Sequence, residues 1–339
     1  MVRERLPWIL ILLVVVWLYK SFIPPPPKIC GTPGGPPITG PRIVLRDGRH
    51  LSYEEYGVPK EIAKYKIIYI HGHSTIKNDP LLEALNLFEE FHVYIVGFDR
   101  PGYGESDPDP KRTFKSTSLD IEELGDHLKL GTKFYIMGYS AGGALGWGCL
   151  KYIPHRLAGI ILIAPGFSFW WPSLPSTLVE EAFYQQDQWI QWNILIAHYT
   201  PWFIYWWNTQ DTHKLFPPSN ATNSLRMLSD SDQIMDNLQE YSTQQGLYES
   251  YLRDGLVLFG DWGFDALNLE NPFVGMEGLV HIWQGDRDED VSVEVQRYIV
   301  NNLPWIHYHE VPNVGHKFAF EDDIKYQILK VLETATHDM

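Results

Sequence analysis

The chain has 339 residues, 45% of them apolar and 14% aromatic, which supports a large buried core and excludes a disordered protein. Its formal net charge of −15 argues against nucleic-acid binding, because that requires basic surface to displace counterions. Two cysteines are too few for a disulfide framework or a cysteine metal site. We expect Cys30 to be an unpaired surface or juxtamembrane thiol and Cys149 a small buried apolar residue.

The chain begins with an apolar segment. From Leu6 to Leu18 nearly every residue is apolar, and the run can extend to Ile23, giving roughly 18 residues, which is near the lower limit for a membrane-spanning helix. A cleaved signal peptide is the alternative, favoured by two arginines before the run, but no small-residue cleavage site follows. We therefore expect residues 1–23 to be an uncleaved, single-pass membrane anchor.

The orientation of this anchor is not readable, because basic residues flank it on both sides. We expect an endomembrane such as the endoplasmic reticulum as the location. Asn220 begins a glycosylation sequon, which matters only if the body of the protein is lumenal. Residues 24–41 are rich in proline and glycine and predict a stiff, extended tether.

From Arg42 onward, strand patterns alternate with helix patterns. Asp47-Gly48 marks a tight turn between two antiparallel edge strands. Further strands are expected at 66–70, 92–98, 133–137, 157–164, 279–284 and 306–311, and helices at 80–91, 116–130, 293–303 and 322–334. Strands that alternate with helices predict an α/β fold with a mostly parallel, doubly wound sheet.

The alternation stops within residues 167–265, which are rich in tryptophan and helical in composition. We expect this segment to be a helical cap, inserted between two parts of the core at 42–166 and 266–339. The run 201–207 offers no polar position for a solvated helix face. Either these aromatic residues pack on the sheet, or part of the surface, with Trp206 and Trp207, contacts the substrate or the bilayer.

The sequence Gly-Tyr-Ser-Ala-Gly at 138–142 lies between a strand and a helix. Small residues two positions either side of the serine are typical of a sharp strand-to-helix turn, where a Cβ would collide with neighbouring backbone. Ser140 would then be exposed at the start of a helix, whose free N–H groups favour developing negative charge. The motif therefore indicates a nucleophilic serine.

A serine hydroxyl needs an imidazole to remove its proton, and the imidazole needs a carboxylate to orient it. Asp288 and His316 each follow a strand near the carboxyl end of the chain, where ligands of a parallel sheet bind. The order Ser140, Asp288, His316 is the one expected for a serine nucleophile on such a turn. These three residues are the predicted catalytic triad.

No metal or cofactor is expected. His307 and His309 alternate along one strand, but a zinc site built on them lacks a third ligand. Substrate-binding residues are not readable, because the cap would select the substrate and its sequence contains no known code.

Over about residues 42–335 the chain resembles a serine hydrolase of the α/β-hydrolase superfamily, and most closely the membrane-anchored group known from plant genomes. The matching motifs are His71-Gly72, the loop from Asp99 to Ser106, the Ser140 turn, Gly285-Asp286-Arg287-Asp288 and Val314-Gly315-His316. The resemblance implies an oxyanion hole formed by the backbone N–H groups of His73 and Ala141. A histidine at 73 departs from the aromatic or aliphatic residue often found there, and would make the pocket more polar.

The resemblance also bears on the alternatives. Asp286 and Asp290 are rival acids, but the spacing after Gly285 supports Asp288. Some relatives transfer acyl groups and carry Asp five residues after the catalytic histidine, where this chain has Glu321. The expected activity is hydrolysis of an ester or thioester through an acyl-enzyme.

Three other functions stay open: an acyltransferase, a receptor-like protein with little turnover, and an interaction module. The expected partners are a small-molecule or lipid-like ester and a membrane, without nucleic acid. The sequence gives no oligomeric state.

Overall fold

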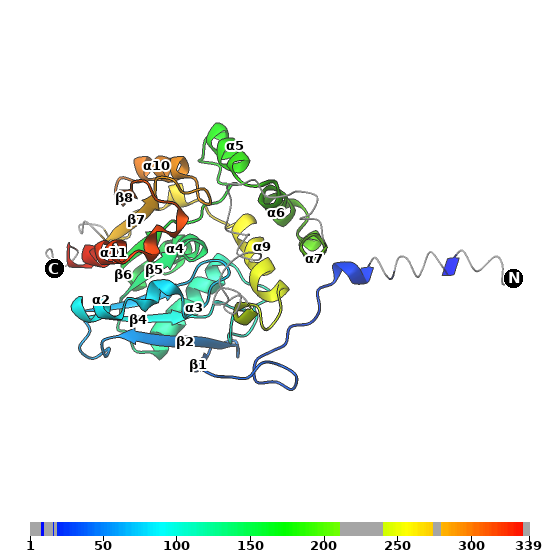
Figure 1. Ribbon diagram of the computed structural model, residues 1–339, viewed down its shortest axis with the longest axis horizontal. Helices are drawn as coiled ribbons and strands as arrows, with labels where there is room; N and C mark the ends of the chain where they lie inside the picture. The colour runs from blue at the N-terminus through cyan, green and yellow to red at the C-terminus, as the bar shows by residue number, and fades with distance from the viewer. Residues whose placement is uncertain (1–7, 10–15, 17–18, 211–239, 274–278, 335–339) are drawn as a thin grey trace.

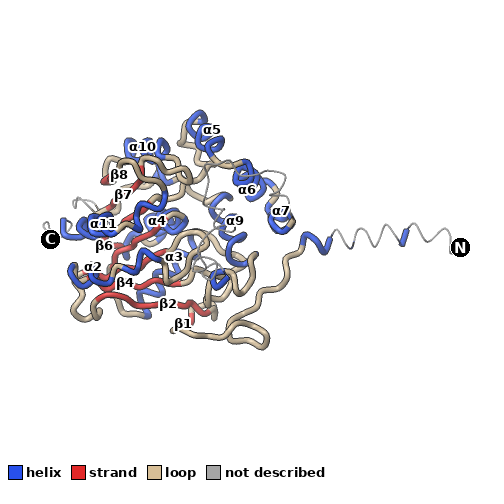
Figure 2. The backbone as a smooth tube through the Cα atoms, in the orientation of Figure 1, coloured by secondary structure: helices blue, strands red, loops and turns tan. Residues whose placement is uncertain are grey.

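The computed structural model describes residues 8, 9, 16, 19–210, 240–273 and 279–334. Eight strands form one sheet in the order β1-β2-β4-β3-β5-β6-β7-β8, in which β2 pairs antiparallel with β1 and β4 and all other neighbours are parallel (Figures 1 and 2). The predicted mostly parallel sheet is confirmed. The strands are β1 Arg42–Val44, β2 His50–Gly57, β3 Tyr65–Ile70, β4 Val93–Phe98, β5 Phe134–Tyr139, β6 Leu157–Ile163, β7 Val280–Gly285 and β8 His307–Val311.

Helices cover both faces of the sheet (Figure 1). Successive side chains of a strand point to opposite faces, so Ile68 and Ile70 of β3 enter one hydrophobic cluster while Ile67 and Tyr69 enter the other. The first cluster includes residues of α3 Phe114–His127, α4 Ala141–Tyr152 and α10 Val293–Asn302, and the second includes residues of α2 Leu85–Glu90 and α11 Asp322–Thr334.

Between β6 and β7, the described residues include four further α-helices, which lie together on one side of the sheet (Figure 1). They are α5 Ser176–Gln185, α6 Gln188–Tyr199, α7 Ile204–Thr209 and α9 Arg253–Phe259, the last directly preceded by a π-helix at Tyr248–Leu252. The sequon at Asn220 lies outside the described residues.

The tryptophans of these helices divide into two groups. Trp207 is 9% exposed and stacks on Trp189 with ring centroids 5.2 Å apart, so this residue follows the packing alternative and not the surface alternative. Trp202, by contrast, is 64% exposed. Ile204 and Trp207, three positions apart, share the buried face of the short helix α7, whereas Trp202 lies in the 3-10 helix Pro201–Phe203 that precedes it.

The structure differs from the sequence-based expectation at residues 80–91 as well. A single helix was expected there, but a 3-10 helix at Pro80–Glu83 ends before α2 begins at Leu85. The Asp79 side chain caps the first piece by accepting a hydrogen bond from the Leu81 N–H, and Ala84 between the pieces has ψ 46°, outside the helical region.

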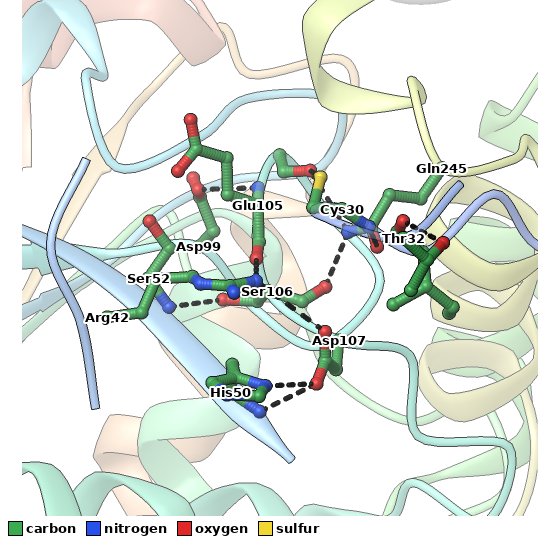
Figure 3. Close-up of polar contacts among 12 residues, drawn as sticks. Cys30, Thr32, Arg42, His50, Ser52, Asp99, Glu105, Ser106, Asp107 and Gln245 are labelled. Carbon is green, nitrogen blue, oxygen red and sulfur yellow. Dashed lines mark hydrogen bonds and ion pairs between the residues drawn. The ribbon is translucent and has the colours of Figure 1, made fainter. Parts of the chain in front are cut away.

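Residues 28–41, here called the N-terminal strap, are bound to the body of the protein (Figure 3). The N–H of Cys30 donates to Oε1 of Gln245 at 3.1 Å, and the N–H of Thr39 donates to Oε1 of Glu105 at 2.9 Å. Cys30 is 3% exposed, so the expectation of a surface thiol is wrong, and burial raises the pKa of this thiol to about 11. Contacts with residues more than 200 positions away bury it, and sequence patterns do not report such contacts.

Most of the predicted anchor, at residues 1–7, 10–15, 17 and 18, falls outside the described residues. Within the part of the chain that the structure describes, no helix has both the length and the apolar character needed to cross a bilayer.

Candidate active site

Ser140 lies at the junction of β5 and α4, with φ 54° and ψ −114°. This left-handed backbone is strained for a residue with a side chain, and the surrounding contacts maintain it. A Cβ on Gly142 would collide with the carbonyl oxygen of Ile70, which is why glycine occupies that position. The N–H of Ser140 donates to the carbonyl oxygen of Ile163 at 2.8 Å, which ties the turn to the neighbouring strand β6.

The three residues of the predicted triad form one hydrogen-bonded chain. Nε2 of His316 lies 2.9 Å from Oγ of Ser140, and Nδ1 of His316 lies 2.8 Å from Oδ2 of Asp288. These residues are up to 176 positions apart in sequence and come from three different strand ends. The arrangement lets Nε2 accept the serine proton while Asp288 fixes the tautomer of the imidazole.

Asp288 is held as an acceptor on both oxygens. Oδ2 accepts a hydrogen bond from Nε2 of Gln284 at 2.7 Å in addition to the one from His316, and Oδ1 accepts from the N–H groups of Asp290 and Val291, both at 2.9 Å. Its side chain is fully buried. Four donors around one carboxylate fix its orientation, with Oδ2 directed at Nδ1 of His316.

Asp288, Asp290 and His316 also place one potential metal-ligand atom each within 4.8 Å of one another. Both ring nitrogens of His316 already have hydrogen-bond partners, so a metal ion would have to displace one of them. The geometry fits a proton-transfer chain better than a cation site.

His309 packs against other side chains. Its Nε2 lies 3.0 Å from Nδ1 of His281, and its ring stacks on Trp283 with centroids 4.2 Å apart. Burial, followed by the charge of His307, lowers the pKa of His309 to about 4. The ring is therefore neutral near pH 7.

The residues predicted to form the oxyanion hole lie beside Ser140. Ala141 is the first residue of α4, so its N–H has no acceptor within the helix. His73 follows β3, and all three residues line the same cavity. The imidazole of His73 turns toward the inserted helices, where it stacks on Tyr251 with centroids 4.1 Å apart and its Nε2 lies 3.2 Å from the Tyr251 carbonyl oxygen.

The cavity above Ser140 has a volume of about 460 Å³, within the range of small-molecule sites. The core contributes Ser140, His316 and neighbouring residues such as Tyr139, and the segment inserted between β6 and β7 contributes about half of the wall. Large apolar side chains dominate that wall: Phe167, Phe169, Trp189, Ile190, Leu258 and Phe259. A substrate with an apolar portion fits this lining, with its reacting carbon at the serine.

The sequence profile of the alpha/beta hydrolase family matches residues 67–325. The chain belongs to the alpha/beta hydrolase family. Solved structures similar to this hydrolase include an esterase from Thermogutta terrifontis, at 18% identity over 88% of this chain and 99% of that one, with a TM-score of 0.53. A carboxylesterase of the thaumarchaeon Nitrososphaera gargenis has 16% identity over 88% and 100% of the two chains and a TM-score of 0.59. An enol-lactonase from Burkholderia xenovorans has 16% identity over 86% and 100%, with a TM-score of 0.55. At these identities the likeness concerns the fold of the hydrolase.

Two residues of the site were not singled out from the sequence. Gln284, at the end of β7, supports Asp288, and its position four residues before that acid was the available signal. Asp254 in α9 forms a buried ion pair with Arg100, 154 positions away, and nothing in its local sequence marks it.

Proposed function

We propose that this hydrolase cleaves a carboxylic ester or thioester through an acyl-enzyme, with Ser140 as nucleophile, His316 as general base and Asp288 as its orienting acid. The observation that carries the proposal is the hydrogen-bonded chain from Asp288 through His316 to Ser140, which ends in an apolar cavity. Membership of the alpha/beta hydrolase family supports it.

In the first half of the reaction, Oγ of Ser140 attacks the substrate carbonyl carbon as its proton passes to Nε2 of His316. The carbonyl oxygen becomes an oxyanion, which the N–H groups of His73 and Ala141 would stabilise. The protonated His316 then donates its proton to the leaving alcohol or thiol. In the second half His316 accepts a proton from a water molecule whose oxygen bonds to the acyl carbon; the bond from that carbon to Oγ then breaks, His316 returns the proton to Oγ of Ser140, and the free acid leaves.

The direct test is turnover of p-nitrophenyl esters of increasing chain length, together with labelling by a fluorophosphonate. Turnover with release of free acid supports hydrolysis. Labelling without turnover would favour a receptor-like protein, whereas product formation only when a second alcohol is present would favour an acyltransferase.

The activity should depend on pH through His316. Burial lowers the pKa of this imidazole, but the charge of Asp288 and the hydrogen bond to it outweigh that effect, and the net pKa is raised above the ordinary histidine value. Only neutral His316 can accept the serine proton, so we expect kcat/KM to be low in acid and to rise with pH through a midpoint above about 6.5. A kcat/KM profile between pH 5 and 9 measures this, and a constant rate across that range would contradict the assignment of the base.

We also propose that the protein belongs to the membrane-anchored group and is held at an endomembrane through residues 1–23. The ring of Phe22 lies 5.6 Å from that of Trp202 and 5.9 Å from that of Trp206. Thus Phe22, near the end of the apolar segment, meets aromatic side chains of the inserted segment, and in Figure 1 α7 is the labelled element nearest to the short helical piece at residues 19–22. Ile190 and Ile204 of the adjacent α6 and α7 line the cavity, so an amphipathic substrate would have a short path from the bilayer.

A protein lacking residues 1–18 should still bind phosphatidylcholine vesicles, and replacing Trp202 and Trp206 with serine should weaken that binding. We expect the partition coefficient to fall by about tenfold or more, because burying two large aromatic rings contributes on the order of 2 kcal/mol. Flotation with vesicles measures it. The control is Tyr184→Ser, because Tyr184 is as exposed as Trp202, at 67%, but lies on α5. Equal loss in both variants would rule out a specific aromatic membrane contact.

A further inference from the structure

The peptide that joins Gly72 to His73 is held by an unusual number of donors. Its carbonyl oxygen lies 2.8 Å from Nδ1 of His71 and accepts hydrogen bonds from the Arg100 guanidinium at 2.9 Å and from the Thr75 hydroxyl at 3.3 Å. The N–H of the same peptide is the predicted oxyanion-hole donor. Carbonyl and N–H of a trans peptide point in opposite directions, so groups that fix the carbonyl also aim the N–H.

The protonation of His71 is set by its neighbours. The backbone N–H of Arg100 donates to Nε2 of His71 at 3.1 Å, so Nε2 carries no proton and Nδ1–H donates to the Gly72 carbonyl. Burial and the positive charge of Arg100 lower the pKa of His71 well below its ordinary value, so the ring is neutral. The only charged donor among the three is therefore Arg100.

Arg100 is fully buried and takes its counter-ion from the inserted helices. Its guanidinium pairs with Asp254 of α9 at 2.5 Å, and the hydroxyl of Tyr103 donates to the other carboxylate oxygen at 3.0 Å. A second buried guanidinium, that of Arg112, lies 3.2 Å from the same Asp254 oxygen. Arg112 donates to the carbonyl oxygen of Pro101 and makes no contact with Gly72 among those found in the described residues. Two guanidinium groups thus share one carboxylate, and one of them contacts the catalytic peptide.

We propose that Arg100 is a positioning residue for the oxyanion hole, and that Asp254 of the inserted helices holds Arg100 in place. A charged donor on the carbonyl side strengthens the dipole of the Gly72–His73 peptide, which makes its N–H a stronger donor to an oxyanion. It also keeps the peptide from rotating as charge develops on the substrate. This inference rests on the proposed serine mechanism, because the donor that Arg100 would align, the His73 N–H, has a role only in that mechanism.

The test compares Arg100→Gln with Arg112→Gln. Both remove a buried guanidinium beside Asp254, but only the first removes the contact with Gly72. For Arg100→Gln we expect kcat to fall about 10- to 100-fold, because the donor remains but loses its alignment and polarisation, and KM for a short ester to change by less than about threefold. A trifluoromethyl ketone, whose adduct with Ser140 carries an oxyanion, should lose affinity by a similar factor. For Arg112→Gln, kcat and the affinity for the ketone should each stay within about threefold of the wild type, although the melting temperature falls.

Equal losses of kcat and of ketone affinity in the two variants would overturn the proposal, because both would then report general destabilisation. If a glutamine variant does not fold, Arg100→Lys and Arg112→Lys give the same comparison, since lysine retains the charge but lacks the two-pronged geometry. Fluorophosphonate labelling of the wild type separates this result from the proposed function. An unlabelled wild type rejects the serine mechanism itself, whereas a labelled wild type with equal variants rejects only the role of Arg100.

Discussion

Ser140→Ala should lose both fluorophosphonate labelling and ester turnover, with kcat reduced on the order of 10⁶ because the covalent route is removed. The substitution deletes one oxygen, and alanine accepts the same backbone conformation at a similar cost, so the melting temperature should stay close to that of the wild type. In-gel fluorescence with the labelled probe and spectrophotometric ester assays measure the two effects.

Ser168→Ala is a suitable control, because Ser168 is also buried but lies outside the cavity lining. It should leave labelling intact. Full activity in Ser140→Ala would remove the acyl-enzyme mechanism altogether, and labelling that persists in that variant would place the reactive group elsewhere in the chain.

Asp288→Asn should be the next most damaging change, with kcat lower on the order of 10⁴. The four groups that contact this carboxylate all act as donors to it, so an asparagine must turn its own NH₂ donor toward another donor. The variant therefore loses the charge that stabilises protonated His316 and disturbs the tautomer of the ring. A pH–rate profile and circular dichroism distinguish the catalytic loss from unfolding.

Asp286→Asn is the matched comparison, since Asp286 lies two positions away on the same turn and its Oδ1 has no hydrogen-bond partner within the described residues. We expect at least a large fraction of wild-type activity there. If Asp286→Asn is inactive and Asp288→Asn is not, the acid has been assigned to the wrong residue.

The sheet was predictable from sequence because each strand pattern is local. In β6, Ile160 to Ile163 form a continuous apolar run of the kind that a doubly covered strand requires, and the structure buries all four. The turn at Ser140 was predictable for the same reason, since Gly142 is demanded by a close backbone approach only a few residues from the serine. Asp288 and His316 were predictable because each follows a strand, and parallel strands bring their carboxyl ends to one edge of the sheet. Their order along the chain after Ser140 gave the same assignment.

What the sequence did not reveal depends on partners far away in the chain. Asp254 is an ordinary helical acid until folding places it against Arg100, and Cys30 is an ordinary thiol until Gln245 covers it. The two tryptophans at 206 and 207 differ for a related reason. Adjacent positions on a helix point about 100° apart, and only the arrangement of α6 and α7 decides which of them packs on Trp189.

If residues 1–23 attach the protein to a membrane, as proposed above, the N-terminal strap limits the distance between the body of the protein and that membrane. If residues 24–41 were wholly free, 18 extended residues would span up to about 60 Å. Because residues 28–41 are bound along the body, only the four consecutive prolines from Pro24 to Pro27 remain as a link, and in the polyproline conformation they span about 12 Å. Binding of the strap to the body thus leaves a short, stiff linker in place of a long one. If residues 1–23 are embedded in a bilayer, this linker restricts both the distance of the body from the membrane and its rotation. One face of the body then stays against the lipid.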